Sequence, residues 1–203
     1  MNKVYYYIII IILSFCSIFL TFKLDLQDKI IDNYNIVINK KKQDVLSFEQ
    51  NFLQEIKNEN LKLNRKTCLL DIEGNRVLTT EIFKKNSVVL RYSEMNCNDC
   101  IQAEIDVLLQ NKSIEVLLIA DYHNKRDLFV YYNELKKRGL SDFMLYNVPV
   151  GGFDLPIEKI NKPFYFCVSS DLKITNIFIP QKNKPKLSES YLITASKNFL
   201  GNK

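Results

Sequence analysis

The hydrophobic positions of the chain form three successive patterns, and the first is an uninterrupted apolar run. Residues 4–22 are nineteen residues without a charge, dominated by Ile, Leu, Phe and Tyr. As a helix they span about 28 Å, close to the thickness of the hydrocarbon core of a bilayer. Lys3 and the α-amino group precede the run and balanced charges follow it, which favours N-in, C-out by the positive-inside rule. We therefore predict a transmembrane signal anchor over residues 1–22 and a globular part outside the cytoplasm.

Two processing alternatives fit this run less well. A cleaved signal peptide has a shorter apolar region and an Ala-x-Ala site after it, and no such site follows here. The stretch ending at Cys16 has the order of a lipoprotein signal, but Phe15 stands where such signals need a small residue. Cys16 is expected instead to be a small hydrophobic side chain inside the membrane.

The second pattern covers residues 23–65, a segment with neither proline nor glycine. Its apolar residues recur at spacings that fit the a and d positions of a heptad, namely Leu24, Ile31, Tyr34, Ile38, Val45, Phe48 and Phe52. Polar Gln27, Lys41 and Glu55 interrupt this register. We predict a helical stalk, and homodimerisation through a coiled coil in this segment is a hypothesis.

In the third pattern, residues 66–203, short apolar strands alternate with amphipathic helices. The pattern predicts a hairpin around residues 73–75, strands over 87–92, 114–120 and 143–146, and a second hairpin over 163–179. Residues 147–161 are expected to form a loop or a short helix. Helices are predicted after the first and second central strands and from Ser188, a good N-cap, to about Leu200. The fold class is therefore α/β, with a central mixed sheet flanked by helices.

Charge excludes one class of partner. The formal net charge of +5 is spread over 203 residues without a basic block or a stripe of interleaved aromatic residues. Nucleic acid is therefore not an expected partner.

The candidate chemistry is the sequence Cys97-Asn98-Asp99-Cys100, between a predicted strand and a predicted helix. The sulfur of a cysteine at a helix start faces unpaired backbone N–H groups, which favour the thiolate. Asn96 is the predicted N-cap, with Asp99 three residues later as in a capping box. Cys97 is then the first helical residue and the attacking thiol, and Cys100 is the resolving thiol one turn on. We predict a dithiol redox site that uses its own disulfide and no separate cofactor.

The helix after the thiols is predicted to be amphipathic. Its apolar face holds Ile101, Ile105, Leu108 and Leu109, and its polar face holds Gln102, Glu104, Asp106 and Gln110.

Other thiol chemistry is weighed against this prediction. A structural metal site is disfavoured because the chain has no second CxxC and only one histidine. His123 follows the second central strand, so Cys97, Cys100 and His123 would be the ligands of a copper-type triad, although a loop histidine is more often simply solvated. Cys68 and Cys167 lie in apolar strands and are expected to pack as small hydrophobic residues, with a disulfide between them as the alternative.

The order of hairpin, strand ending in CxxC, βα unit, strand opening with proline, hairpin and final helix resembles the thioredoxin fold. With its leading hairpin, the chain is similar to the membrane-anchored, thioredoxin-like (TlpA/redoxin-type) thiol-disulfide oxidoreductases of bacterial cell envelopes, over roughly residues 67–200. The resemblance implies a single-pass protein of the cytoplasmic (inner) membrane with a periplasmic domain. Its implied partners are protein dithiols and disulfides of the cell envelope.

The resemblance also implies a substrate-binding position. In that family a cis-proline lies beside the thiol pair, and the backbone next to it pairs with the substrate chain. Lys162-Pro163 matches this position. We therefore expect a cis bond at Pro163, although a proline at the start of a strand can also be trans.

Several residues depart from the family pattern. The usual tryptophan before the first cysteine is Asn96, the usual Gly-Pro is Asn98-Asp99, and the expected buried acid aligns with Arg91. Glu94 and Asp99 oppose the thiolate, whereas the helix N-terminus and Arg91 favour it, so these three side chains are predicted to tune the thiol pKa. We hypothesise that the acids make the pair less oxidising than an acid-free CxxC.

Two other functions would keep the same fold. A peroxidatic cysteine follows a Pro-x-x-x-Thr-x-x-Cys pattern, but Leu90 and Glu94 occupy the proline and threonine positions, so the donors that activate a peroxide are missing. A thioredoxin-like interaction domain would bind a protein in the same groove without exchange, and the presence of both cysteines argues against it. The sequence thus predicts a thiol-disulfide oxidoreductase, with an interaction or copper-handling domain as the alternative.

Overall fold

The structure is a computed structural model that describes residues 3–140, 143–148 and 152–201. Its contacts divide the chain into two compact units, Met1–Gln50 and Asn51–Lys203. Residues 149–151 of the predicted 147–161 loop lie outside the described residues.

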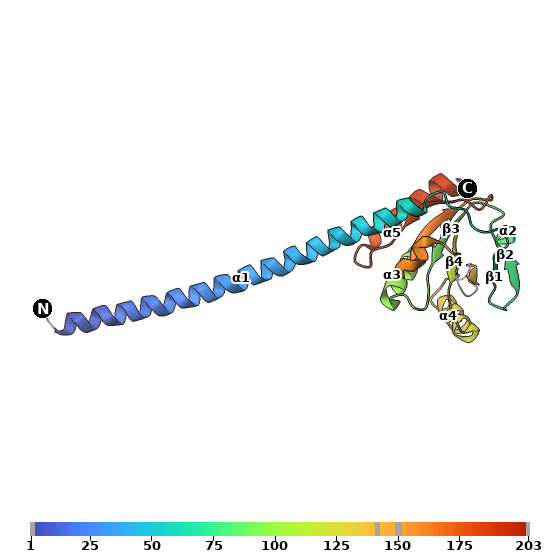
Figure 1. Cartoon of the computed structure of the whole chain (residues 1–203). Helices are drawn as coiled ribbons and strands as arrows, with labels where there is room; N and C mark the ends of the chain where they lie inside the picture. Colours follow the sequence, from blue (N-terminus) through green and yellow to red (C-terminus); the bar gives the residue numbers. More distant parts are fainter. Residues whose placement is uncertain (1–2, 141–142, 149–151, 202–203) are drawn as a thin grey trace. The chain divides into compact units, whose positions relative to one another are not determined.

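Helix α1 (Lys3–Asn58) runs without interruption through the predicted anchor from Lys3 and through the predicted stalk as far as Asn58 (Figure 1). Its apolar side chains from Ile8 to Phe22 are exposed. By length and composition this helix can cross a membrane. The predicted helix is therefore confirmed as far as Asn58, whereas residues 59–65 of the predicted stalk are not helical. The orientation in a membrane stays a prediction.

The second unit is built on a mixed sheet (Figure 1). Its strands, in the spatial order β2-β1-β5-β4-β3-β6-β7, are β2 (Arg76–Leu78), β1 (Cys68–Leu70), β5 (Leu145–Asn147), β4 (Val116–Ala120), β3 (Ser87–Arg91), β6 (Phe164–Val168) and β7 (Ile174–Phe178). Strands β3, β4 and β5 are parallel neighbours, whereas β6 is antiparallel to β3 and to β7. Both predicted hairpins, β1–β2 and β6–β7, are confirmed.

The alternation of side chains along the strands produces two hydrophobic cores, one on each face of the sheet. Helices α3 (Asn98–Gln110), α4 (Lys125–Lys137) and α5 (Pro185–Ala195) pack over one face, where they bury residues such as Ile105, Leu135 and Leu192. The other face is covered by irregular segments, the short helix α2 (Thr79–Ile82) and the 3-10 helix η1 (Pro156–Ile160), which bury Phe83 and Ile157.

Two local predictions about the helices are wrong. Ser188 does not cap the last helix, because α5 begins earlier with Pro185 in its first turn, a position where a missing N–H costs nothing. A π-helical turn, η2 (Ser196–Leu200), then extends the helix. Glu104 does not lie on an exposed polar face of α3, because α5 packs against α3 and leaves this side chain only 1% exposed.

The last turns of α1 belong to the second unit. Ile179 and Ile177 of the β7 edge donate their backbone N–H groups to the carboxylates of Glu55 and Glu59, at 2.8 and 3.3 Å. The buried Asn58 accepts the backbone N–H of Ile157 at 3.1 Å. These bonds occupy backbone donors that an edge strand otherwise exposes. The contacts therefore include residues 51–59 in the folded domain, whereas the sequence pattern placed its start at residue 66.

Candidate active site

The thiol pair lies where β3 passes into α3. The connecting loop is tied to the end of β4, because Tyr92 and Glu94 donate backbone N–H groups to the carbonyls of Ile119 and Asp121, both at 3.0 Å. Cys97 is the N-cap residue of α3 and not the first helical residue that the sequence predicted, because the helix begins at Asn98. The backbone N–H of Cys100 donates to the Cys97 carbonyl at 2.9 Å. Cys97 is exposed, whereas Cys100 is partly buried beneath the first turn. The predicted order of an accessible thiol and a covered thiol at a helix start is therefore present.

The pKa values of the two thiols are shifted in opposite directions. The Cys100 thiol and the Cys100 backbone N–H both donate to the Cys97 sulfur, and these bonds lower the pKa of Cys97. Burial is the largest cause that raises the pKa of the Cys100 thiol to about 11, and its hydrogen bond to Cys97 adds to this effect. Cys97 is thus the thiol of the pair that ionises more readily.

Asn96 is not the N-cap that the sequence predicted. Its side chain accepts the backbone N–H of Ser93 at 2.8 Å and donates to the side-chain oxygen of Asn161, also at 2.8 Å. Asn161 in turn donates to the carbonyl of Met95 at 3.4 Å. Because Asn161, the residue after η1, accepts this bond, Asn96 links the loop before Cys97 to the segment before Pro163.

Lys162 and Pro163 therefore lie beside the loop that precedes Cys97. The prediction of a cis bond at Pro163 is wrong, since no peptide bond between described residues is cis. Asn161 adopts the left-handed conformation (φ 53°, ψ 43°) and turns the chain just before Lys162. Because the turn is made there, the Lys162–Pro163 peptide bond is in its more stable trans form. The ammonium of Lys162 donates to the side chain of Asn51 at 3.0 Å.

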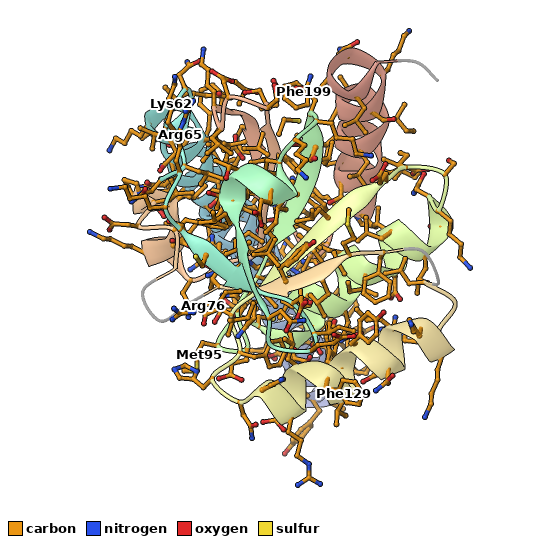
Figure 2. All side chains as sticks on the ribbon, turned by 90° about the vertical axis from the view of Figure 1, so that its right-hand side faces the viewer. Lys62, Arg65, Arg76, Met95, Phe129 and Phe199 are labelled. Atoms are coloured by element: carbon orange, nitrogen blue, oxygen red, sulfur yellow. The ribbon has the colours of Figure 1, made fainter. Side chains whose placement is uncertain are left out.

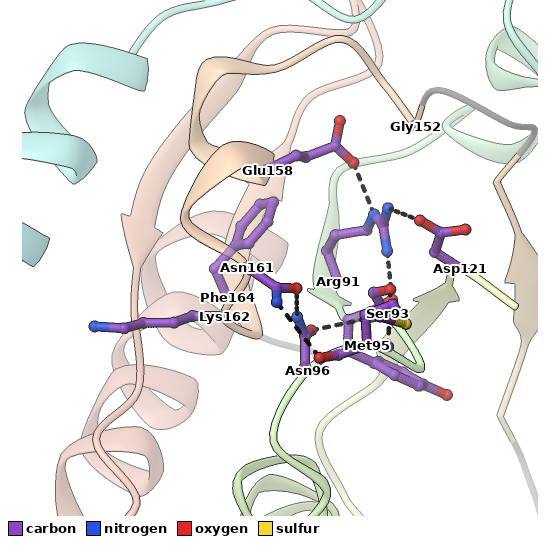
Figure 3. A pocket seen from close by; sticks show the side chains of 11 residues that line it. Arg91, Ser93, Met95, Asn96, Asp121, Gly152, Glu158, Asn161, Lys162 and Phe164 are labelled. Atoms are coloured by element: carbon purple, nitrogen blue, oxygen red, sulfur yellow. Dashed lines mark hydrogen bonds and ion pairs between the residues drawn. The ribbon is translucent and has the colours of Figure 1, made fainter.

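Arg91 lines a cavity of about 220 Å³ next to these loops (Figure 3). Its guanidinium donates to Glu158 at 2.9 Å and to Asp121 at 3.4 Å, and also to the carbonyl of Tyr92. The Arg91 side chain is 5% exposed, and that of Asp121 is 32% exposed. Met95 and Phe164 add apolar surface to the cavity. Arg91 is thus held by two carboxylates, and its predicted effect on the thiols stays a prediction.

Both acids near the thiols have a cationic or imidazole partner. The Asp99 carboxylate binds the ammonium of Lys182 at 2.7 Å. Glu94 contacts the His123 ring at 2.5 Å and accepts the His123 backbone N–H at 3.2 Å. Within the described part of the chain, no group of three His, Cys, Asp or Glu side chains is arranged to hold a metal ion. The structure therefore does not bring His123 and the two cysteines together as a triad.

The other two cysteines of the second unit lie in strands and not at the start of α3. Cys167 is buried in β6, and burial raises the pKa of its thiol. Cys68 is partly buried in β1, and Cys16 is exposed on α1.

Sequence reasoning missed several residues of this site. These residues are distant from Cys97 in the sequence: Lys182, Asn161 and Asp121 lie in loops, and Glu158 lies in η1. No local spacing relates these residues to Cys97, so the sequence carries no signal that would have found them.

The strand order, the thiol pair at the start of α3 and the β6–β7–α5 ending define a thioredoxin-like domain with a CxxC site. No family model and no curated protein sequence matches the chain. Solved structures similar to it include a thiol:disulfide interchange protein from Bacteroides sp., with 15% identity, 68% of this chain and 93% of that chain covered, and a TM-score of 0.45. A second is the exposed lipoprotein thioredoxin Etrx1 of Streptococcus pneumoniae, with 14% identity, 62% and 98% covered, and a TM-score of 0.41.

A third similar structure is BsSco, a member of the Sco family of cytochrome c oxidase assembly proteins. Its identity is 10%, with 67% of this chain and 97% of that chain covered and a TM-score of 0.39. At these identities and TM-scores the likenesses carry no argument, and function has to be argued from the site.

Proposed function

We propose that the protein is a single-pass, membrane-anchored oxidoreductase that exchanges disulfides with proteins outside the cytoplasm. One observation carries the proposal: Cys97 is exposed at the N-cap of α3 and Cys100 lies partly buried in the first turn, and the pKa values of the two thiols shift in opposite directions. An attacking thiol needs access and thiolate character, whereas a resolving thiol has to stay protonated until the mixed disulfide forms.

The exchange proceeds in two displacements. The Cys97 thiolate attacks one sulfur of a substrate disulfide, a Cys97–substrate bond forms, and the substrate S–S bond breaks to release one thiolate, which takes up a proton. Cys100 then loses its proton and attacks the Cys97 sulfur, which releases the second substrate thiolate, and this thiolate takes up the proton that Cys100 lost. The substrate gains two electrons and two protons, and Cys97 and Cys100 become a disulfide. A dithiol returns the pair to the reduced state, and the reverse sequence oxidises a substrate.

The surface beside Cys97 suits a protein substrate. Met95 is 68% exposed and projects from the surface (Figure 2). The Arg91 cavity opens next to Met95, and Lys162-Pro163 borders the same loops. An extended substrate segment placed along Pro163 would bring its disulfide to Cys97 and its neighbouring side chains to Met95 and the cavity.

A redox titration of the full chain in detergent tests the proposal. The protein is equilibrated with mixtures of reduced and oxidised glutathione, alkylated, and analysed by mass spectrometry. We expect a single two-electron transition confined to Cys97 and Cys100, which Cys97→Ser abolishes and Cys68→Ser leaves unchanged. A pair that never closes, or a Cys97 that closes only with Cys68 or Cys167, refutes the exchange function and favours a binding role.

Two further measurements address substrate and location. With a protein disulfide as substrate, Cys100→Ser should accumulate a mixed disulfide on Cys97, whereas Cys97→Ser should not. In intact cells, a membrane-impermeant maleimide should label Cys97 if the domain lies outside the cytoplasm, as the charges flanking the helix favour. Labelling only after the cells are lysed would place the domain inside.

A further inference from the structure

Lys182 brings a positive charge to the thiol pair from a distant part of the chain. It lies in the loop between β7 and α5, which the backbone bond from the N–H of Lys184 to the carbonyl of Gln181 closes at 2.8 Å. Its ammonium binds Asp99, 83 positions earlier in the sequence, at 2.7 Å. Asp99 stands between the two cysteines in the first turn of α3. The ion pair therefore joins the β7–α5 loop to the turn that holds Cys97.

Within the described part of the chain, Cys100, Lys182 and Asp99 are charged or titratable groups that shift the pKa of Cys97. After the hydrogen bonds from Cys100, the charge of Lys182 lowers the pKa of Cys97 and that of Asp99 raises it. The ion pair also lowers the pKa of Asp99 and raises that of Lys182, so both groups stay charged near neutral pH. The thiol pair thus sits beside a matched cation and anion.

We propose that Lys182 is a positioning cation for the exchange reaction and that Asp99 anchors its ammonium beside the Cys97 sulfur. This inference rests on the proposed function and names the residue that regulates its attacking thiol. Because a stabilised thiolate stabilises the reduced form, Lys182 makes the pair more oxidising. Asp99 then has two opposing effects, since it repels the thiolate directly and holds the cation that attracts it.

The test follows alkylation of Cys97 against pH in the reduced full chain in detergent. Lys182→Gln is compared with Lys182→Arg and with Lys186→Gln, which removes the same charge from the exposed first turn of α5. We expect Lys182→Gln to move the alkylation curve to higher pH and to slow alkylation at pH 7 by about two- to fivefold, the range of an exposed charge interaction. Lys182→Arg should restore the rate, and Lys186→Gln should leave it unchanged.

Added salt tests whether Lys182 acts through its charge, and a second substitution tests whether Asp99 holds the Lys182 ammonium. The difference between Lys182→Gln and the unmodified chain should shrink at about 1 M salt, where exposed charges are screened. In an Asp99→Asn background the effect of Lys182→Gln should be smaller, because the ammonium is no longer held.

An alkylation curve of Lys182→Gln that matches that of Lys186→Gln would overturn the role of Lys182. An equal effect of Lys182→Gln with and without the Asp99 carboxylate would overturn the role of Asp99 in holding the Lys182 ammonium. Alkylation requires no disulfide exchange. If Cys97 and Cys100 form no disulfide in the glutathione titration, the proposed function is refuted. The alkylation experiment still tests the effect of Lys182 on Cys97 in that case.

Discussion

Substitution of Arg91 tests how much its ion pair with Glu158 contributes to the stability of the domain. The Arg91 side chain is 5% exposed and bonds Glu158, itself 15% exposed, at 2.9 Å. Arg91→Met keeps most of the side-chain length but leaves a nearly buried carboxylate without its cation. Breaking a buried pair in this way costs about 3–5 kcal/mol. Glu158 still accepts the backbone N–H groups of Phe153 and Leu155, at 2.8 and 3.3 Å, so we expect the lower end, about 3 kcal/mol.

Thermal unfolding measures this loss. At about 2–4 °C per kcal/mol for a domain of this size, Arg91→Met should lower Tm by roughly 6–12 °C. Near-UV circular dichroism of the tyrosines reports the folded domain, since α1 contributes chiefly to the far-UV signal. Arg76→Met on β2 is the matched control, because Arg76 is exposed and its loss should change stability by less than about 0.5 kcal/mol.

The double variant Arg91→Met/Glu158→Gln separates charge from packing. It removes both members of the pair and leaves no unpaired buried charge, so it should recover part of the lost stability. A loss below about 1 kcal/mol in Arg91→Met, or a double variant less stable than Arg91→Met, would refute the argument that this pair is buried and coupled.

Three further predictions concern α3, the domain boundary and the stalk. Burial is the main cause that raises the pKa of Glu104, so the stabilising contribution of Glu104 is present at low pH and is lost as pH rises through the folded-state pKa. Glu104→Gln should therefore be more stable than the unmodified protein at pH 7 but equal to it near pH 4, and an equal gain at both pH values would contradict this. A fragment of residues 51–203 should unfold cooperatively, whereas a fragment of residues 66–203 should not, because the shorter fragment lacks buried Leu63 and the α1 residues that bond the β7 edge. Equal near-UV transitions for the two fragments would disprove this. Sedimentation of the full chain in detergent should give a dimer mass if the stalk forms a coiled coil, and a monomer at every concentration would rule it out.

The buried polar groups around Glu104 explain why its ionised form is costly. The hydroxyls of Ser188 and Tyr165 lie close enough to lower the pKa of Glu104, against the larger effect of burial. However, Glu104 Oε2, Tyr165 Oη and Ser188 Oγ lack a well-formed hydrogen bond within the described residues. A neutral carboxyl or amide suits such a site better than a carboxylate.

The sequence alone determined the elements whose signals are local. The long helix of residues 3–58 follows from an apolar run and a segment without proline or glycine. Both hairpins follow from apolar strands flanking polar turns, and Gly74 adopts a positive φ of 92° at the first turn, where glycine is favoured. The CxxC pair at a helix start follows from the order of strand, cysteines and amphipathic helix. Each signal depends on spacings of a few residues, which the sequence displays directly.

The tertiary structure alone decided which groups surround the thiols. Asp99 binds Lys182, and Asn96 binds Asn161 instead of capping α3, because the paths of β7 and η1 bring these partners to the helix start. Glu104 fits a polar helix face in the sequence pattern, yet the packing of α5 buries it. Charge pairing and burial depend on segments that are distant in sequence, and the periodicity of one segment carries no information about which other segment will cover it.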